Sequence, residues 1–100
     1  MIRGGYAYIM TNRNNSVLYT GVTSELGNRI YQHKTREHIN FFTSKYKTFK
    51  LVYYAGFDTI EEAIAEEKRI KGGSRAKKEK LINEMNPEWV DLYDTIPDGE

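Results

Sequence analysis

The sequence predicts an α+β fold, an α/β sandwich in which helices pack on a small, mainly antiparallel three-stranded sheet. Three observations predict it: a hairpin pattern near the start of the chain, one further strand-like run near its middle, and helix-capping signals after both. The expected order of elements is β-β-α-β-α-α. Because 100 residues is the size of one modest domain, we expect residues 1–100 to form a single domain.

The hairpin is expected from two runs of aromatic and β-favouring residues, 6–10 and 17–22, with a polar turn cluster between them. Successive strand residues point to opposite faces, so Tyr6 and Tyr8 share one face. Tyrosines in such positions usually line the edge of a core. They can also orient or deprotonate a water molecule, or stack on a base, and the pattern leaves both roles open.

The first helix is expected to begin at a Thr23 or Ser24 cap and to run to about Thr35. On a helical wheel of about 100° per residue, Arg29 and His33 fall on or beside the apolar stripe, where charged residues are unusual. Arg29 has a planar guanidinium that suits a phosphate, and His33 can transfer a proton near neutral pH. The alternative is that both residues lie at the edge of the core.

One strand and two helices are expected in the rest of the chain. After a polar and aromatic loop, residues 50–55 form the third strand. A Thr59–Glu62 capping box then opens a helix over about 60–71, which a glycine pair ends.

The last helix is expected to begin at a Ser74 cap and to stop near Asn86, because Pro87 follows. The Asn-Pro pair suggests a short final turn through Trp89. We expect the tail over residues 93–100 to be frayed, as chain ends without a clear structural pattern often are.

Glu67 occupies an unusual position in the helix over 60–71. The apolar face of that helix is defined by Ile60, Ala63, Ile64 and Ile70, and Glu67 falls near its centre. A carboxylate there is costly unless it is paired, protonated or metal-bound. A hard cation such as Mg²⁺ or Mn²⁺ would compensate, and so would an ion pair with a neighbouring lysine or arginine. The position of Glu67 on the helix does not by itself distinguish a bound cation from an ion pair.

Charge is distributed unevenly along the chain, although the net charge is only +1. Residues 1–50 carry eight Lys and Arg against two Asp and Glu, whereas residues 51–100 carry seven against twelve. All seven lie between positions 68 and 80, where basic residues in a first helical turn oppose the helix dipole. This stretch is either a solvated helix start or a phosphate contact. The residues at which we expect nucleic acid are Lys71, Arg75, Lys77 and Lys78.

Composition excludes several classes of protein. The chain has no cysteine, which excludes disulfides, thiolate zinc sites and cysteine nucleophiles. No apolar run approaches the ~20 residues of a membrane span, and the first residues do not form a signal peptide. We therefore expect a cytoplasmic protein with no membrane partner, whose oligomeric state the sequence does not indicate.

Short motifs follow one another at a specific spacing over residues 5–92. The first two are Tyr6-Ala7-Tyr8 and, across the hairpin turn, Tyr19-Thr20-Gly21. The others include Leu26-x-x-Arg29-Ile30-x-x-His33-Lys34, Ala63-Ile64-x-x-Glu67-Lys68 and Asn86-Pro87-x-Trp89. Together they resemble the GIY-YIG nuclease superfamily, and within it a small single-domain group similar to the N-terminal catalytic domain of the excision-repair nuclease UvrC.

The resemblance implies a role for each residue of a catalytic site. Tyr8 and Tyr19 line the site, and Tyr19 or a neighbour helps to activate the attacking water. Arg29 holds the scissile phosphate, and His33 is the candidate proton-transfer partner. Glu67 binds one divalent metal, Mg²⁺ or Mn²⁺, which stabilises the transition state and the leaving oxygen.

The resemblance also matches Asn86 to a late family asparagine near the site, which makes it a candidate nucleic-acid contact. A helix cap explains this asparagine equally well. The chain departs from the family pattern at Tyr6, Thr20 and Gly73, where the motifs have glycine, isoleucine and tryptophan. None of these changes removes a residue assigned to the chemistry.

The sequence therefore favours a metal-dependent endonuclease that hydrolyses phosphodiester bonds in DNA, in repair or recombination. One alternative is a nucleic-acid-binding module with little or no activity, because most enzymes of this family gain specificity from an attached domain. Another is a protein-interaction domain that uses the acidic tail over residues 84–100.

Overall fold

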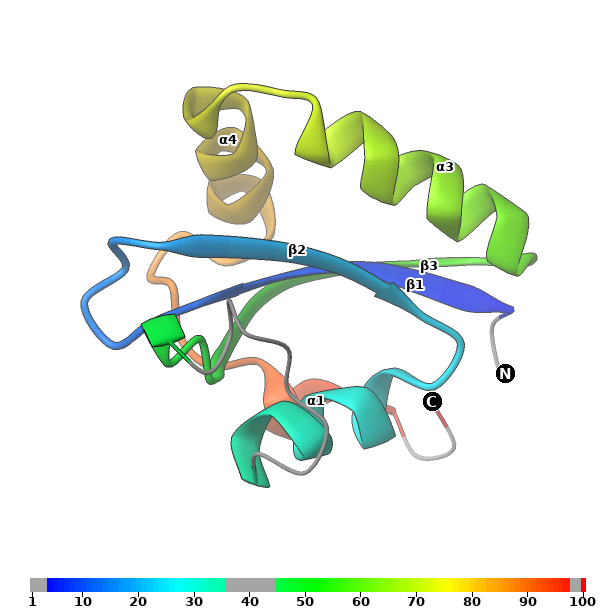
Figure 1. The fold of residues 1–100 in the computed structure, drawn as a ribbon, viewed down its shortest axis with the longest axis horizontal. Coiled ribbons are helices and arrows are strands. Elements are labelled where there is room, and N and C mark those ends of the chain that lie inside the picture. Colours follow the sequence, from blue (N-terminus) through cyan, green and yellow to red (C-terminus); the bar gives the residue numbers. More distant parts are fainter. Residues whose placement is uncertain (1–3, 36–44, 98–99) are drawn as a thin grey trace.

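A three-stranded antiparallel sheet in the order β2-β1-β3 forms the centre of the molecule (Figure 1). The computed structural model describes residues 4–35, 45–97 and 100. Strand β1 (Gly5–Thr11) lies between β2 (Leu18–Thr23) and β3 (Lys50–Phe57). The predicted α+β fold and its order, β-β-α-β-α-α, are confirmed.

Helices cover both faces of this sheet (Figure 1). Helix α1 (Leu26–Thr35) packs on one face, and α3 (Ile60–Lys71) and α4 (Arg75–Met85) pack on the other. A short 3-10 turn, Tyr93–Thr95, follows on the α1 side. Because β1 is central and covered on both faces, every residue along it is buried.

Two apolar clusters follow from the alternation along β1. Tyr6, Tyr8 and Met10 point to the α1 side, and Ala7 and Ile9 point to the other side, so the two tyrosines share one face as predicted. The helices add Leu26 and Ile30 to the first cluster, and Ile70 and Ile82 to the second. Each fully buried side chain of this size contributes about 1.5–3 kcal/mol.

The predicted capping residues set the limits of α3 and α4. The Thr59 hydroxyl accepts a hydrogen bond from the Glu62 N–H at 3.2 Å, and the Glu62 carboxylate accepts one from the Thr59 N–H at 3.2 Å. The Ser74 hydroxyl likewise accepts from the Lys77 N–H at 3.2 Å. These bonds satisfy N–H groups that have no partner within their own helix.

Helix α1 begins slightly later than the sequence suggests. The Thr23 hydroxyl accepts a hydrogen bond from the Glu25 N–H at 3.1 Å, but the first helical hydrogen bond runs from the Arg29 N–H to the Glu25 carbonyl at 2.9 Å. Glu25 therefore lies at the helix boundary rather than within the first turn. Residues 36–44 of the expected loop lie outside the described residues.

Residues 89–96, after α4, include two residues of the expected frayed tail that pack on the core. Trp89 adopts a left-handed conformation with φ of 54°. Tyr93 and Ile96 belong to the tail that was expected to fray, yet both pack against the cluster under α1. None of the helices in the described part of the chain combines the length and apolarity that crossing a bilayer requires.

Candidate active site

Tyr8 and Gly21 face each other across the first two strands. They are register partners on β1 and β2, and the Tyr8 ring lies over the glycine. A Cβ at position 21 would come within 2.5 Å of both Cζ and the hydroxyl oxygen of Tyr8. Only glycine leaves this space, so the second motif provides the opening that the tyrosine of the first motif needs.

Tyr8 reaches His33 through that opening. Its hydroxyl oxygen lies 3.2 Å from His33 Nε2, and both side chains are buried. The Tyr19 ring completes the group, with its centroid 6.4 Å from that of Tyr8 and 5.6 Å from that of His33. Strands β1 and β2 and helix α1 thus bring three rings together at one side of the sheet.

Burial keeps the hydrogen-bonded pair uncharged. It lowers the pKa of His33 from 6.5 to about 4, with a further contribution from the positive charge of Arg29. Burial also raises the pKa of Tyr8 well above its usual value, with help from Tyr19 and against the opposing effect of Arg29. At neutral pH the two groups share one hydrogen bond, whose direction depends on the histidine tautomer. Within the described residues, the buried Nδ1 of His33 has no partner.

Arg29 lies at the solvent side of this pair. It is exposed, one helical turn before His33, and its guanidinium is close enough to act on the pKa of both Tyr8 and His33. A phosphate oxygen could approach this guanidinium from solvent. Arg29 and His33 therefore lie beside the core, as the helical period predicted. Only His33 is buried in it.

Glu67 is buried as the wheel predicted, with 8% of its surface exposed. Its carboxylate forms an ion pair with Lys71, at 2.8 Å from Oε2 to Nζ, and the lysine side chain is 58% exposed. This hydrogen bond to Glu67 raises the pKa of Lys71. Glu67 also raises the pKa of Tyr8, so its charge acts on the ring group.

The ion pair is the alternative partner that the sequence left open for Glu67. Over the described ranges 4–35, 45–97 and 100, no three His, Asp or Glu side chains gather as a set of metal ligands. A cation bound at Glu67 would therefore take one carboxylate from this part of the chain and its other ligands from water and substrate.

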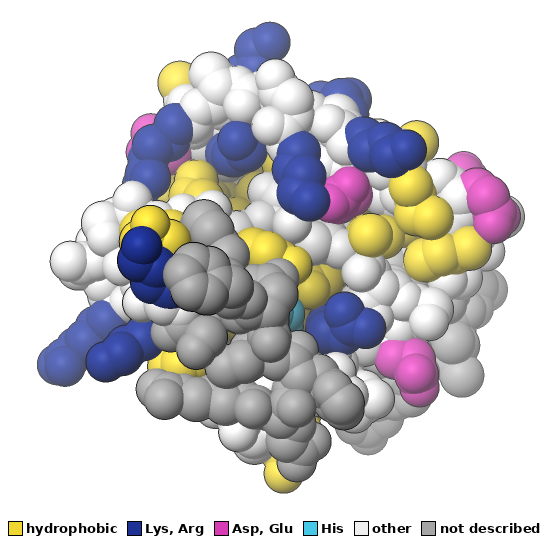
Figure 2. Space-filling model, viewed as in Figure 1, with side chains coloured by type: hydrophobic (Ala, Val, Ile, Leu, Met, Phe, Trp, Pro, Cys, Tyr) yellow, Lys and Arg dark blue, Asp and Glu magenta, His cyan; other side chains and the backbone are white. Residues whose placement is uncertain are grey.

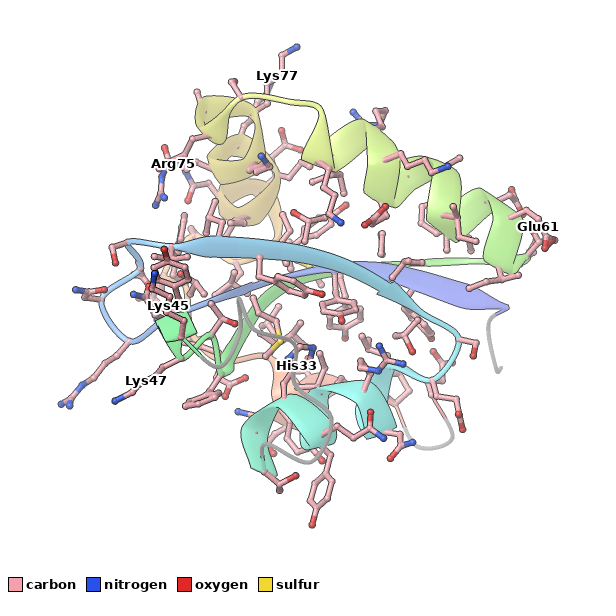
Figure 3. The ribbon with its side chains drawn as sticks, in the orientation of Figure 1. His33, Lys45, Lys47, Glu61, Arg75 and Lys77 are labelled. Atoms are coloured by element: carbon pink, nitrogen blue, oxygen red, sulfur yellow. The ribbon has the colours of Figure 1, made fainter. Side chains whose placement is uncertain are left out.

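The four basic residues predicted to contact nucleic acid, from Lys71 at the end of α3 to Lys78 in α4, lie in three different settings. Lys71 and Lys78 line a hollow of about 290 Å³ together with Tyr19, beside the ring group. Arg75 instead joins α4 to the β1–β2 turn, where the Ser16 carbonyl accepts from it at 2.8 Å. Lys77 points away from the sheet (Figure 3).

The surface around this region is basic on the face shown in Figure 2. A small part of a histidine side chain is visible in Figure 2, and Figure 3 identifies it as His33. Lys and Arg side chains lie on several sides of it. Few carboxylates interrupt them on this face. An anionic ligand would therefore be attracted to this face of the protein.

A comparison with known families agrees with this geometry. Residues 4–80 match the family model of the GIY-YIG catalytic domain. The chain belongs to the GIY-YIG nuclease family. Membership in this nuclease family implies that the chain binds nucleic acid.

Relatives of the chain are similarly small. A UPF0213 protein of Staphylococcus saprophyticus, SSP2268, is 39% identical over 79% of this chain and 94% of its own length. A UPF0213 protein of Oceanobacillus iheyensis, OB0043, is 38% identical over 77% of this chain and 87% of its own length. The solution structure of UPF0213 protein BH0048 from Bacillus halodurans matches with a TM-score of 0.54 and 32% identity, over 85% of this chain and 88% of that one.

Asn86 has a structural role at the end of α4. Its buried amide donates to the Val90 carbonyl at 2.7 Å and to the Val52 carbonyl at 3.3 Å, and accepts from the Val90 N–H at 3.1 Å. It also ends α4, where its N–H donates to Ile82. These bonds correspond to the helix-cap alternative; its contact with nucleic acid stays a prediction.

Two features of the site were not recognised in the sequence. An ion pair of Glu67 with a neighbouring cation was considered, but its partner was not identified; the i,i+4 spacing, at which opposite charges meet on one helix face, points to Lys71. The steric role of Gly21 could have been suspected because glycine inside a strand often marks a close approach by another group.

Proposed function

We propose that the protein is a cytoplasmic endonuclease that hydrolyses phosphodiester bonds in DNA with one divalent cation, Mg²⁺ or Mn²⁺, in repair or recombination. The observation that supports this most directly is Tyr8 itself. Its hydroxyl touches His33, and its pKa responds to both Arg29 and Glu67. Tyr8 therefore contacts a proton acceptor, and the charges of Arg29 and Glu67 both act on it.

The residues present fit a single hard cation. Mg²⁺ keeps several waters in proteins and commonly takes one or two carboxylates together with substrate phosphate oxygens, which is what Glu67 offers. When bound, the cation would supply charge stabilisation on the phosphoryl group and the leaving oxygen. Glu67 would exchange its present partner, Lys71, for the cation.

Arg29 would hold the scissile phosphate. Its exposed guanidinium can donate two parallel hydrogen bonds to phosphate oxygens. A phosphate paired with Arg29 also offsets the positive charge that helps to lower the pKa of His33. Substrate binding thus makes His33 a better proton acceptor at the moment when it is needed.

The Tyr8–His33 pair would move the proton. As the attacking water gives a proton to the Tyr8 oxygen, the hydroxyl passes its own proton to His33 Nε2, 3.2 Å away. The water oxygen forms the new bond to phosphorus, and the bond from phosphorus to the leaving oxygen breaks. The leaving oxygen takes a proton from solvent. Tyr19, in ring contact with both, orients the water.

A cleavage panel tests this proposal. Labelled duplex, flap, fork and single-stranded DNA are incubated with Mg²⁺ or Mn²⁺ and the parent protein, Arg29→Ala or Glu67→Ala. We expect each substitution to reduce cleavage by at least about a hundredfold. Glu66→Ala is the matched control, because Glu66 neighbours Glu67 but pairs with Arg69 on the surface. Unchanged cleavage in both site variants would show that the assigned site is wrong.

The ion pair between Glu67 and Lys71 favours a second candidate function. Because this carboxylate is already paired without a cation, the domain could bind nucleic acid and cleave little or none of it. Binding that falls steeply with salt, does not change in Glu67→Ala and leads to no cleavage would support this function.

A further inference from the structure

A groove of about 780 Å³ lies beside the β1–β2 turn, apart from the residues of the proposed site. Its walls come from that turn, from the end of α1 and from the segment that leads into β3. Figure 3 shows Lys45 and Lys47 at this end of the molecule. We call it the turn-side groove; its lining includes Arg13, Lys34, Tyr46, Lys47, Phe49 and Lys50.

The turn-side groove has an excess of positive charge. Of the lining residues that the structure describes, four are lysine or arginine and one, Asp91, is acidic. Asp91 is already engaged, because it forms an ion pair with Lys34 and accepts a hydrogen bond from the Leu51 N–H at 3.3 Å. Among the residues that the structure describes, no carboxylate pairs with Arg13 or Lys47. The groove therefore suits an anionic ligand.

Aromatic side chains accompany these charges. Tyr46 is 39% exposed, and the Lys45 ammonium lies 5.4 Å from its ring centroid. Phe49 contributes a second, partly exposed ring. Cations that follow a backbone, with aromatic rings between them, are typical of surfaces that bind single-stranded nucleic acid, because unpaired bases can stack. Paired bases in a duplex do not expose their faces in this way.

The groove and the proposed site share the end of α1. His33 points to the ring group, while the next residue, Lys34, lines the groove and donates to the Phe49 carbonyl at 3.1 Å. Asn12 at the groove follows Tyr8 by four positions, at the end of β1, which is about 14 Å of extended chain. One nucleic-acid strand can span this distance with a few nucleotides.

We propose that the turn-side groove binds unpaired nucleotides of the strand that is cut. The substrate is then a duplex with a single-stranded end or branch within a few nucleotides of the scissile phosphate. This inference rests on the proposed nuclease function, and it adds the substrate class.

Binding to matched DNA substrates tests the groove directly. A labelled blunt duplex is compared with the same duplex carrying a short thymidine overhang, with chelator present so that nothing is cleaved. We expect the overhang to tighten binding about tenfold in the parent protein, and Tyr46→Ala to remove most of that gain. The charge reversal Lys47→Glu should act in the same direction, because Lys47 is exposed and its replacement does not disturb the core.

Lys80→Glu is the matched charge reversal, because Lys80 is an exposed lysine of α4 outside the groove. It should weaken binding of the blunt and overhang substrates by the same factor. An overhang gain that survives both Tyr46→Ala and Lys47→Glu overturns the proposal for the groove.

Cleavage of the same substrates with Mg²⁺ separates the two proposals. Cleavage without any preference for the overhang overturns the groove and leaves the nuclease in place. Overhang-dependent binding that is lost in the groove variants, without cleavage of any substrate, supports the groove and contradicts the nuclease. Failure to bind any of the substrates overturns both.

Discussion

The Tyr8 ring lies across β2 at Gly21, where a Cβ would come within 2.5 Å of the tyrosine hydroxyl. The same hydroxyl is 3.2 Å from His33 Nε2. The two named motifs of the GIY-YIG family are therefore joined by a steric requirement in this chain: the glycine of one allows the tyrosine of the other to meet its hydrogen-bond partner.

Gly21→Ala should disturb the site from within the strand. Because the added methyl group must displace the buried Tyr8 ring, we expect a loss of about 1–3 kcal/mol in the free energy of unfolding. Cleavage should fall by at least tenfold, since the contact with His33 is broken. Urea unfolding and a cleavage assay measure the two effects.

The control for this substitution is Gly27→Ala in α1. Among the described residues, a Cβ at Gly27 would have no neighbour closer than 3.7 Å, and alanine is favoured over glycine in a helix by up to about 1 kcal/mol. We expect equal or higher stability and normal cleavage. If Gly21→Ala behaves like this control, the Tyr8 ring does not depend on the glycine.

His33 should make stability depend on pH. The folded protein keeps His33 neutral down to about pH 4, whereas the unfolded chain protonates it near pH 6.5. Between these values the unfolded state binds more protons, so the contribution is complete above about pH 6.5 and is lost as the pH falls toward 4. The largest possible loss is about 3 kcal/mol.

Urea unfolding from pH 4 to pH 7 tests this dependence in the parent protein and in His33→Gln, which cannot titrate at this position. Other groups contribute equally to both curves, so the difference between them isolates the histidine. A difference that stays constant across the range would mean that His33 has an ordinary pKa in the folded protein.

Much of the fold follows from local signals in the sequence. The Thr59–Glu62 capping box and the Ser74 cap depend only on neighbouring residues, so the limits of α3 and α4 could be predicted closely. The burial of Glu67 was predictable because the helical period alone determines which face a residue occupies.

Features that depend on distant contacts could not be predicted in this way. Tyr93 and Ile96 in the tail pack on a cluster that includes residues of β1 and α1. The role of Arg75 depends on the turn at residues 15–16, about sixty positions earlier. The turn-side groove likewise combines four separate segments, so no local pattern indicates it.

Lys71 should compete with a cation for Glu67. Lys71→Met keeps much of the side-chain length but removes the ammonium, and an ion pair with an exposed partner is worth about 0.2–1 kcal/mol. We therefore expect Mn²⁺ to bind the protein alone about two- to fivefold more tightly, as measured by calorimetry. Lys68→Met, an exposed neighbour on α3, is the control and should leave the affinity unchanged. Weaker binding in Lys71→Met would contradict the competition.

Arg75 and Lys78 lie three residues apart on α4, and their replacement by alanine should have opposite effects. One should affect stability and the other the salt dependence of DNA binding. The Arg75 guanidinium donates to the Asn15 carbonyl at 2.7 Å, to the Ser16 carbonyl at 2.8 Å and to Glu79 at 2.8 Å. Arg75→Ala should therefore lower the free energy of unfolding by about 1–2 kcal/mol. It should leave the salt dependence of DNA binding nearly unchanged, because this guanidinium is engaged within the fold.

Lys78→Ala should show the reverse. Lys78 lines the hollow beside Tyr19, so its loss removes about one phosphate contact and flattens the plot of log affinity against log salt by about 0.9. Its hydrogen bond to the Gly73 carbonyl, at 3.1 Å, gives it only a small share in stability. If the plot of log affinity against log salt is flatter for Arg75→Ala than for Lys78→Ala, the phosphate contact lies at the β1–β2 turn and not in the hollow.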